Sequence, residues 1–127
     1  MSALLDTTIL IDVLRARNER RELLQQMVSA GETLYTSAIN VGEVYAGMRP
    51  HEARMTDSLL NSLHSYAITP DIAKRAGMLQ YSLAREGKTR LLADLIVAVT
   101  AMEYGLPIAT DNRKDFEETG VSFYLVD

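Results

Sequence analysis

The sequence predicts an α/β domain in which a mainly parallel, five-stranded sheet is covered by helices on both faces. Short apolar or β-prone runs alternate along the chain with longer segments in which apolar residues recur at helical spacing. Such alternation is typical of parallel sheets, because each crossover connection lays a helix on one face. The 127 residues, 47% of them hydrophobic, are enough for one core, so we expect a single domain over residues 1–127.

The expected elements follow in order from the N-terminus. Apolar or β-branched runs predict strands at residues 3–5, 33–37, 65–69, 107–110 and 122–126. Helical spacing predicts helices at residues 8–14, 18–30, 39–48, 51–64, 70–85 and 91–104. Pro70 suits the first turn of a helix, and Gly31, Gly87 and Gly105 each follow a predicted helix end.

The composition excludes several classes of protein. The chain has no cysteine, which rules out a disulfide framework, a thiolate zinc site and a cysteine nucleophile. Asp6 and Asp12 interrupt the apolar start, so we expect a cytoplasmic protein with no signal peptide, membrane span or membrane partner. The net charge of −4 is unfavourable for binding the phosphates of a nucleic acid. Two features would offset it: bound metal would neutralise some of the acids, and basic residues cluster locally, as at Arg113 and Lys114.

Acidic residues occur where parallel α/β sheets bind ligands, at the carboxyl ends of strands. Asp6 ends the first predicted strand, and Asp111 and Asp115 follow the fourth. Asp94 is the only charge in the run from 91 to 102, where an unpaired carboxylate would be desolvated at a cost in free energy. Glu43 lies on a predicted helix among small and apolar neighbours.

Each of these acids also has a purely structural explanation. Asp94 lies near a helix start, where an acid caps the helix or interacts with its dipole, and Asn112 with Asp115 has the spacing of a capping box. These explanations do not account for several acids that converge, because crowded carboxylates repel and a hard divalent cation relieves that repulsion. Mg²⁺ or Mn²⁺ fits better than zinc, since only His51 and His64 offer nitrogen, and such ions support phosphodiester hydrolysis.

Four segments resemble, in order and spacing, the PIN-domain nucleases and, within them, the VapC-type toxins of toxin–antitoxin pairs. They are residues 5–12 (LDTTILID), 37–43 (SAINVGE), 92–98 (LADLIVA) and 108–116 (IATDNRKDF). The resemblance implies a three-layer α/β/α PIN-like fold and a Mg²⁺- or Mn²⁺-dependent endoribonuclease acting on structured RNA. It also implies a homodimer and a cognate antitoxin protein that covers the acidic groove.

The same resemblance implies roles for individual residues. Asp6 and Asp94 correspond to the main metal ligands and Glu43 to a further acid of the catalytic centre, while Thr8 would support the site by hydrogen bonding. The fourth acid of the family falls within residues 111–115.

Within this last segment, many relatives carry Asp at the position of Asn112. Asp111 and Asn112 should point to opposite sides as the strand ends, and the family match places Asn112 on the side of the site, where its amide can cap the following helix. We therefore expect Asp115 to be the fourth acid, with Asp111 pointing away. Arg113 and Lys114 are expected at the rim, in contact with RNA phosphate.

Three other functions compete with this interpretation. A catalytically inactive PIN-like binding module would act only through partners, and the intact Asp6, Glu43 and Asp94 argue against it. A receiver-like phosphoacceptor domain needs paired acids after the first strand, where this chain has Thr7 and Thr8 after Asp6. A phosphatase of the haloacid-dehalogenase type would need an Asp in place of Thr8.

Overall fold

A computed structural model describes residues 2–126 of the chain. The strands are β1 (Ala3–Leu5), β2 (Leu34–Ser37), β3 (His64–Tyr66) and β4 (Ile108–Ala109). The α-helices are α1 (Thr7–Leu14), α2 (Arg20–Ser29), α3 (Ala38–Gly47), α4 (Ala53–Asn61), α5 (Pro70–Arg85) and α6 (Leu92–Glu103), and two 3₁₀ turns are η1 (Pro50–Glu52) and η2 (Arg113–Phe116). No helix within residues 2–126 is both long and apolar enough to cross a membrane.

The sheet is parallel throughout, in the order β3-β2-β1-β4. Leu4 lies opposite Tyr35 of β2 on one side and Ile108 of β4 on the other. The first strand is therefore central, and its carboxyl end is flanked by the ends of two strands that come from distant parts of the chain.

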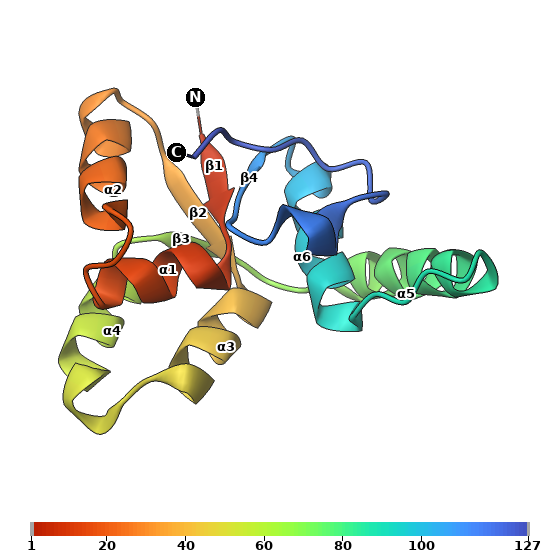
Figure 1. Ribbon diagram of the computed structural model, residues 1–127, viewed down its shortest axis with the longest axis horizontal. Coiled ribbons are helices and arrows are strands. Elements are labelled where there is room, and N and C mark those ends of the chain that lie inside the picture. The colour runs from red at the N-terminus through yellow and green to blue at the C-terminus, as the bar shows by residue number, and fades with distance from the viewer. Residues whose placement is uncertain (1, 127) are drawn as a thin grey trace.

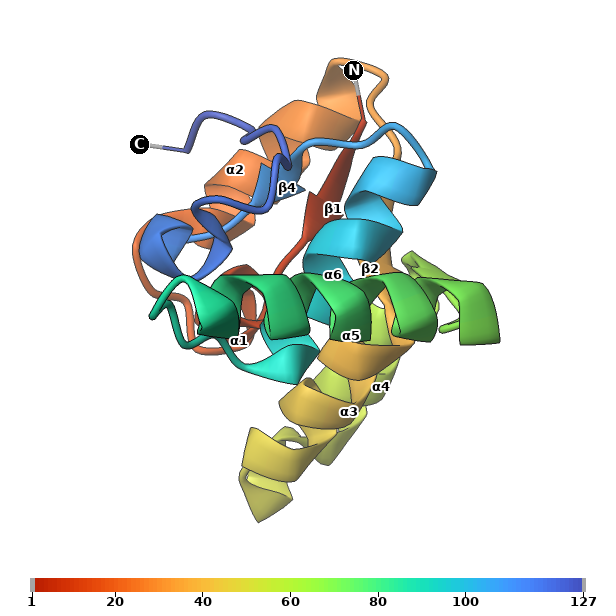
Figure 2. The same cartoon turned by 90° about the vertical axis from the view of Figure 1, so that its right-hand side faces the viewer.

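Helices cover both faces of the sheet, as predicted. Figure 1 shows α1, α2 and α4 on one side and α5 and α6 on the other. Side chains alternate accordingly, since Ala3 and Leu5 belong to the core beneath α1, α2 and α4, while Leu4 and Ile108 pack against α6. Figure 2 shows α5 lying across α6 on its outer side, where the two helices share a further apolar cluster. The molecule thus has the predicted three-layer α/β/α arrangement.

The prediction of a fifth strand at residues 122–126 is wrong. Within residues 2–126 this segment contributes a single parallel bridge, between Phe123 and Ile108. The Ile108 N–H donates to the Ser122 carbonyl and its own carbonyl accepts from the Tyr124 N–H, at 2.9 and 2.8 Å. Because β4 is only two residues long, the ladder has no backbone along which to extend.

The predicted helix at residues 51–64 is also too long. The segment begins with the 3₁₀ turn η1, which Pro50 starts, and α4 ends at Asn61. His64 belongs to β3, where it lies opposite Tyr35. Sheet pairing on β2 therefore decides the conformation of His64, and helical periodicity does not.

Candidate metal centre

Asp6 lies at the centre of the carboxyl edge of the sheet, directly after β1. Its N–H donates to the carbonyl of Ala109 at 2.9 Å, which ties it to the end of β4. Asp6 is 6% exposed, and its carboxylate accepts hydrogen bonds from the Thr110 hydroxyl at 2.7 Å and from the Asn40 amide at 3.1 Å. Burial raises the pKa of Asp6, the Thr110 hydrogen bond lowers it in part, and the charge of Glu43 raises it again.

Asp94 lies in the first turn of α6, whose N-terminus reaches the same edge. Its carboxyl is half-buried, and its pKa rises to about 6, first because of burial and then because of the charges of Asp115, Asp6 and Glu43. The structure therefore places Asp6, Glu43 and Asp115, predicted acids from three other segments, within electrostatic reach of Asp94. Among residues 2–126, no three acidic or histidine side chains are close enough to hold an ion between them as they stand.

Glu43 is exposed on α3 and is held by a chain of hydrogen bonds that leads back to Asp6. The Thr7 hydroxyl donates to its carboxylate at 2.6 Å, and Thr7 in turn accepts from the amide of Asn40 at 3.0 Å. The Ser37 hydroxyl donates to the carbonyl oxygen of that same amide at 2.7 Å. Asn40 thus orients both carboxylates while adding no charge.

Sequence reasoning missed Asn40, Thr7 and Thr110 as orienting residues. A signal was present for Asn40, because it lies three residues before Glu43 and shares its helix face. Thr8, which the resemblance pointed to, accepts a hydrogen bond from the backbone N–H of Asp111 at 3.3 Å and so contacts the loop after β4.

In the loop after β4, the two candidate acids take different directions. Asp111 forms an ion pair with Arg20 at 2.6 Å, whereas the charge of Asp115 acts on Asp94 and raises its pKa. The prediction that Asn112 caps the following turn is wrong, because its side chain accepts no capping hydrogen bond. Instead its backbone N–H donates to the Thr110 hydroxyl at 3.0 Å.

The two basic residues of this loop differ in their surroundings. The guanidinium of Arg113 lies over the ring of Phe123, 4.4 Å from its centroid, and the side chain of Lys114 is exposed. Both positions are thus at the surface beside Asp115, while only Arg113 is held by an aromatic ring.

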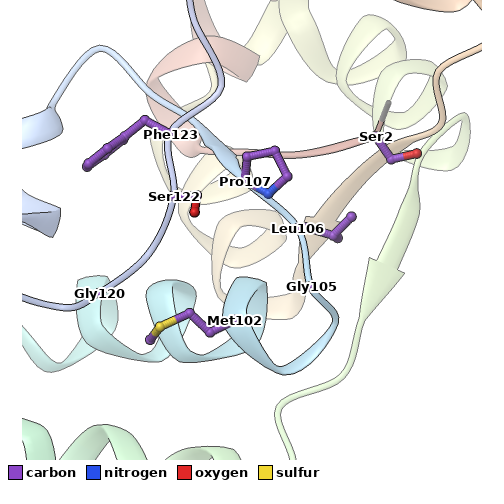
Figure 3. A pocket seen from close by; sticks show the side chains of 8 residues that line it. All are labelled: Ser2, Met102, Gly105, Leu106, Pro107, Gly120, Ser122 and Phe123. Carbon is purple, nitrogen blue, oxygen red and sulfur yellow. The ribbon is translucent and has the colours of Figure 1, made fainter.

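A cavity of about 610 Å³ lies at the opposite, amino end of β4 (Figure 3). Its walls include Met102, Leu106, Pro107 and Phe123, and none of the residues that line it is ionisable. It therefore offers neither an acid–base pair nor metal ligands, and the carboxylate group around Asp6 is the candidate site for chemistry.

Known proteins of one family match this chain over most of its length. The sequence profile of the PIN domain matches residues 3–121. Ribonuclease VapC10 of Mycobacterium tuberculosis is 33% identical over 109 residues, which cover 86% of this chain and 81% of that protein. Ribonuclease VapC19 of the same species is 29% identical over 115 residues, covering 89% and 90% of the two chains.

Solved structures agree with this assignment. A toxin–antitoxin complex from Klebsiella pneumoniae matches with a TM-score of 0.77 at 30% identity, over 98% of this chain and 99% of that chain. VapBC2 from Rickettsia felis, solved with a fragment of promoter DNA, has the same fold, with a TM-score of 0.85 at 19% identity over the whole of both chains. The chain belongs to the PIN-domain family and, within it, to the VapC ribonucleases.

Proposed function

We propose that this protein is a Mg²⁺- or Mn²⁺-dependent endoribonuclease that hydrolyses structured RNA and is the toxin of a toxin–antitoxin pair. The observation that carries the proposal is the convergence of Asp6, Glu43, Asp94 and Asp115 at one edge of the sheet, with the pKa of Asp94 raised to about 6. Within residues 2–126, none of these four carboxylates forms an ion pair with a basic side chain. A bound cation would supply the missing positive charge.

The side chains present fit a hard divalent cation. The donors are carboxylate oxygens, which Mg²⁺ and Mn²⁺ prefer, and neither histidine belongs to the group. Mg²⁺ commonly keeps several waters and binds through one or two carboxylates, so an open arrangement is suitable. Asp6 and Asp94 would hold the ion, with Glu43 and Asp115 as outer acids.

When bound, the ion supplies Lewis acidity toward a phosphoryl oxygen and toward the attacking water. The side chains of this protein hold the carboxylates in position and contact the RNA. Thr110 and Asn40 fix the Asp6 carboxylate, and Thr7 fixes that of Glu43. Lys114 and Arg113 at the rim would meet the phosphates of the RNA.

Cleavage of labelled RNA by purified protein, with and without EDTA, tests the proposal. Mn²⁺ should also raise the melting temperature of the wild type through binding to the native state. Asp94→Asn should abolish both effects, and Asp71→Asn, which changes an exposed acid on α5, should abolish neither. Cleavage that persists in EDTA, or an equal thermal shift in Asp94→Asn, would contradict it. A wild type that binds Mn²⁺ but cuts no RNA would favour the inactive binding module.

For the antitoxin we propose the groove between α1, α2 and α4 as the docking surface. A cavity of about 330 Å³ there is lined by apolar side chains, among them Leu14, Met55 and Leu59, together with Arg21 and Arg54. This combination suits a segment that carries apolar and acidic side chains. Met55→Asp should prevent co-purification with the antitoxin and leave RNA cleavage by the free protein unchanged.

For a homodimer we propose the face formed by α5 and the start of α6. Met78, Tyr81, Leu91 and Leu92 are exposed there by 60, 64, 70 and 42%, and the Gln80 amide, which donates to the Arg90 carbonyl, holds the two segments together. Exposed apolar side chains gathered in this way are typical of a protein interface. Sedimentation velocity should show a dimer that Tyr81→Lys converts to a monomer, and an unchanged dimer would place the interface elsewhere.

A further inference from the structure

We infer that the ion pair between Arg20 and Asp111 is a positioning pair: it holds the loop after β4 in the orientation that the carboxylate site requires. This inference rests on the proposed function. The two residues are 91 positions apart, and the guanidinium lies 2.6 Å from the Asp111 carboxylate. The side chain of Arg20 is 8% exposed and that of Asp111 31%. An ion pair shielded from water in this way is weakened little by salt.

Asp111 matters because of the residues on either side of it. Before it, the Thr110 hydroxyl donates to Asp6, and after it the turn η2 carries Asp115, whose charge acts on Asp94. The N–H of Asp111 itself donates to Thr8 at the start of α1. The placement of Asp111 therefore governs the direction of both site residues that the loop supplies.

Arg20 reaches this loop because of an unusual turn between α1 and α2. Ala16, Asn18 and Glu19 all have positive φ, at 52, 54 and 57°, although none of them is glycine. These angles cost backbone energy, which the surroundings must offset. The Asn18 amide, for example, donates to the Asp12 carboxylate at 2.8 Å. Strained backbone of this kind is typical of functional segments. Here the turn places Arg20 next to the loop after β4.

The role differs from that of a metal ligand or an RNA contact. Arg20 is buried and pairs with Asp111, which is not one of the proposed metal ligands, so it acts on the site through Asp111. Residues that orient metal ligands in this indirect way typically change metal affinity or activity by 10- to 100-fold when replaced. A pair with a purely structural role would alter stability and leave the affinity for metal unchanged.

The test compares Arg20→Gln, Asp111→Asn and the double variant. We expect each single variant to raise the Mn²⁺ dissociation constant, measured by calorimetry, and to lower kcat by about tenfold, with KM for RNA nearly unchanged. The double variant should be no worse than the more impaired single one, because both changes break the same interaction. Arg20→Lys, which keeps the charge, should restore part of the loss.

Glu52→Gln is the matched control. It breaks another shielded ion pair, with Arg15 at 3.3 Å, which lies outside the site and in which the side chain of Glu52 is 6% exposed. It should lower the melting temperature without changing the Mn²⁺ dissociation constant or kcat. Amide hydrogen exchange over residues 111–116 should be at least about tenfold faster in Arg20→Gln and Asp111→Asn than in Glu52→Gln.

Three results would contradict the positioning role of the pair. The first is wild-type metal affinity and wild-type amide hydrogen exchange in Arg20→Gln. The others are additive losses of metal affinity and kcat in the double variant, or equal losses of both in Glu52→Gln. If Arg20→Gln does not fold, Asp111→Asn gives the same comparison from the more exposed partner. If the wild type itself neither binds Mn²⁺ nor cleaves RNA, the proposed function fails, and the exchange experiment still decides whether the pair holds the loop.

Discussion

The amide of Asn40 donates a hydrogen bond to the carboxylate of Asp6 across 3.1 Å, and both side chains are buried. The same nitrogen donates to the hydroxyl of Thr7, and the amide oxygen accepts from Ser37. A neutral donor is well suited to this place. A lysine or arginine here would neutralise Asp6 and compete with a metal ion.

We expect Asn40→Leu, which keeps the volume and removes the amide, to impair both stability and activity. It leaves the buried Ser37 hydroxyl and Asp6 each with one hydrogen bond fewer, at a cost of about 1–3 kcal/mol for each buried group. Cleavage should fall by about tenfold, as is common for residues that orient metal ligands. Thr100→Val removes a buried hydrogen bond to Ile96 within α6 and is the control for stability alone. Equal cleavage by the two variants would refute the orienting role of Asn40.

The acids proposed for the site are those that the sequence singles out, whereas the residues that orient them could largely not be predicted. A charge such as Asp94 inside an apolar helix is conspicuous, because burying an unpaired carboxylate is costly. Neutral polar residues such as Thr110 are ordinary at strand ends, so only the contact with Asp6 identifies their role. Arg20 and Asp111 are 91 positions apart, so no local sequence pattern predicts their ion pair.

The fold shows the same division between local and long-range information. Apolar runs and helical spacing predict the alternation of strands and helices, since those signals lie within each segment. The residues that were assigned wrongly depend on partners elsewhere: His64 joins β3 because β2 is beside it, and Phe123 forms only a bridge because β4 is short. The order of the strands likewise arises from packing between distant segments.

In the metal-free protein, we expect Asp94→Asn to be more stable than the wild type at neutral pH. The folded-state pKa of Asp94 is raised from 3.8 to about 6, so the stability associated with its protonated form is fully present below about pH 4 and is lost as the pH rises through 6. The full shift corresponds to about 3 kcal/mol, and solvent at this half-buried carboxyl reduces it to about 1 kcal/mol.

Thermal unfolding across pH 4 to 8 checks this expectation. At pH 7.5 the variant should melt about 4 °C higher, and the difference should disappear near pH 4. Saturating Mn²⁺ should reverse the order, because only the wild type gains stability from binding. A variant that is less stable than the apo wild type at neutral pH would show that the Asp94 charge has a compensating partner.

Asp115→Asn should lower RNA cleavage by at least about tenfold, a loss of roughly 1.4 kcal/mol in transition-state stabilisation. It should also lower the pKa of Asp94, measured by NMR in the metal-free protein, because the charge of Asp115 is one cause of the elevation. Glu117→Gln removes an exposed acid two positions away and serves as the control. If both variants cleave normally and the pKa of Asp94 does not move, Asp115 has no part in the site.

Replacing Arg113 and Lys114 together with alanine should weaken RNA binding and flatten its salt dependence. The logarithmic slope should fall by up to about two phosphate contacts, at roughly 0.7 to 0.9 for each contact, the values for single strands and for duplex. Arg113→Ala should in addition cost about 0.5–1 kcal/mol of stability, because it removes the contact with Phe123. Binding is measured by anisotropy in the Asp94→Asn background, with Lys74→Ala on α5 as control. An unchanged slope would place the RNA path elsewhere.

Neither histidine is placed to assist attack by a ribose 2′-hydroxyl. His51 is exposed in η1, and the ring of His64 packs edge-on against Tyr35 and Tyr66, whereas the site consists of carboxylates. Metal-assisted hydrolysis uses water as the nucleophile, and its products carry a 5′-phosphate and a 3′-hydroxyl.

An RNA with one 2′-deoxy sugar at the scissile position should therefore be cut within about threefold of the rate for the unmodified RNA, a difference below 1 kcal/mol in the barrier. The matched control carries the deoxy sugar three nucleotides away, and protein of the Asp94→Asn variant purified in parallel excludes a contaminating ribonuclease. Loss of cleavage with the first substrate alone, together with a cyclic phosphate from normal RNA, would show that the 2′-hydroxyl is the nucleophile.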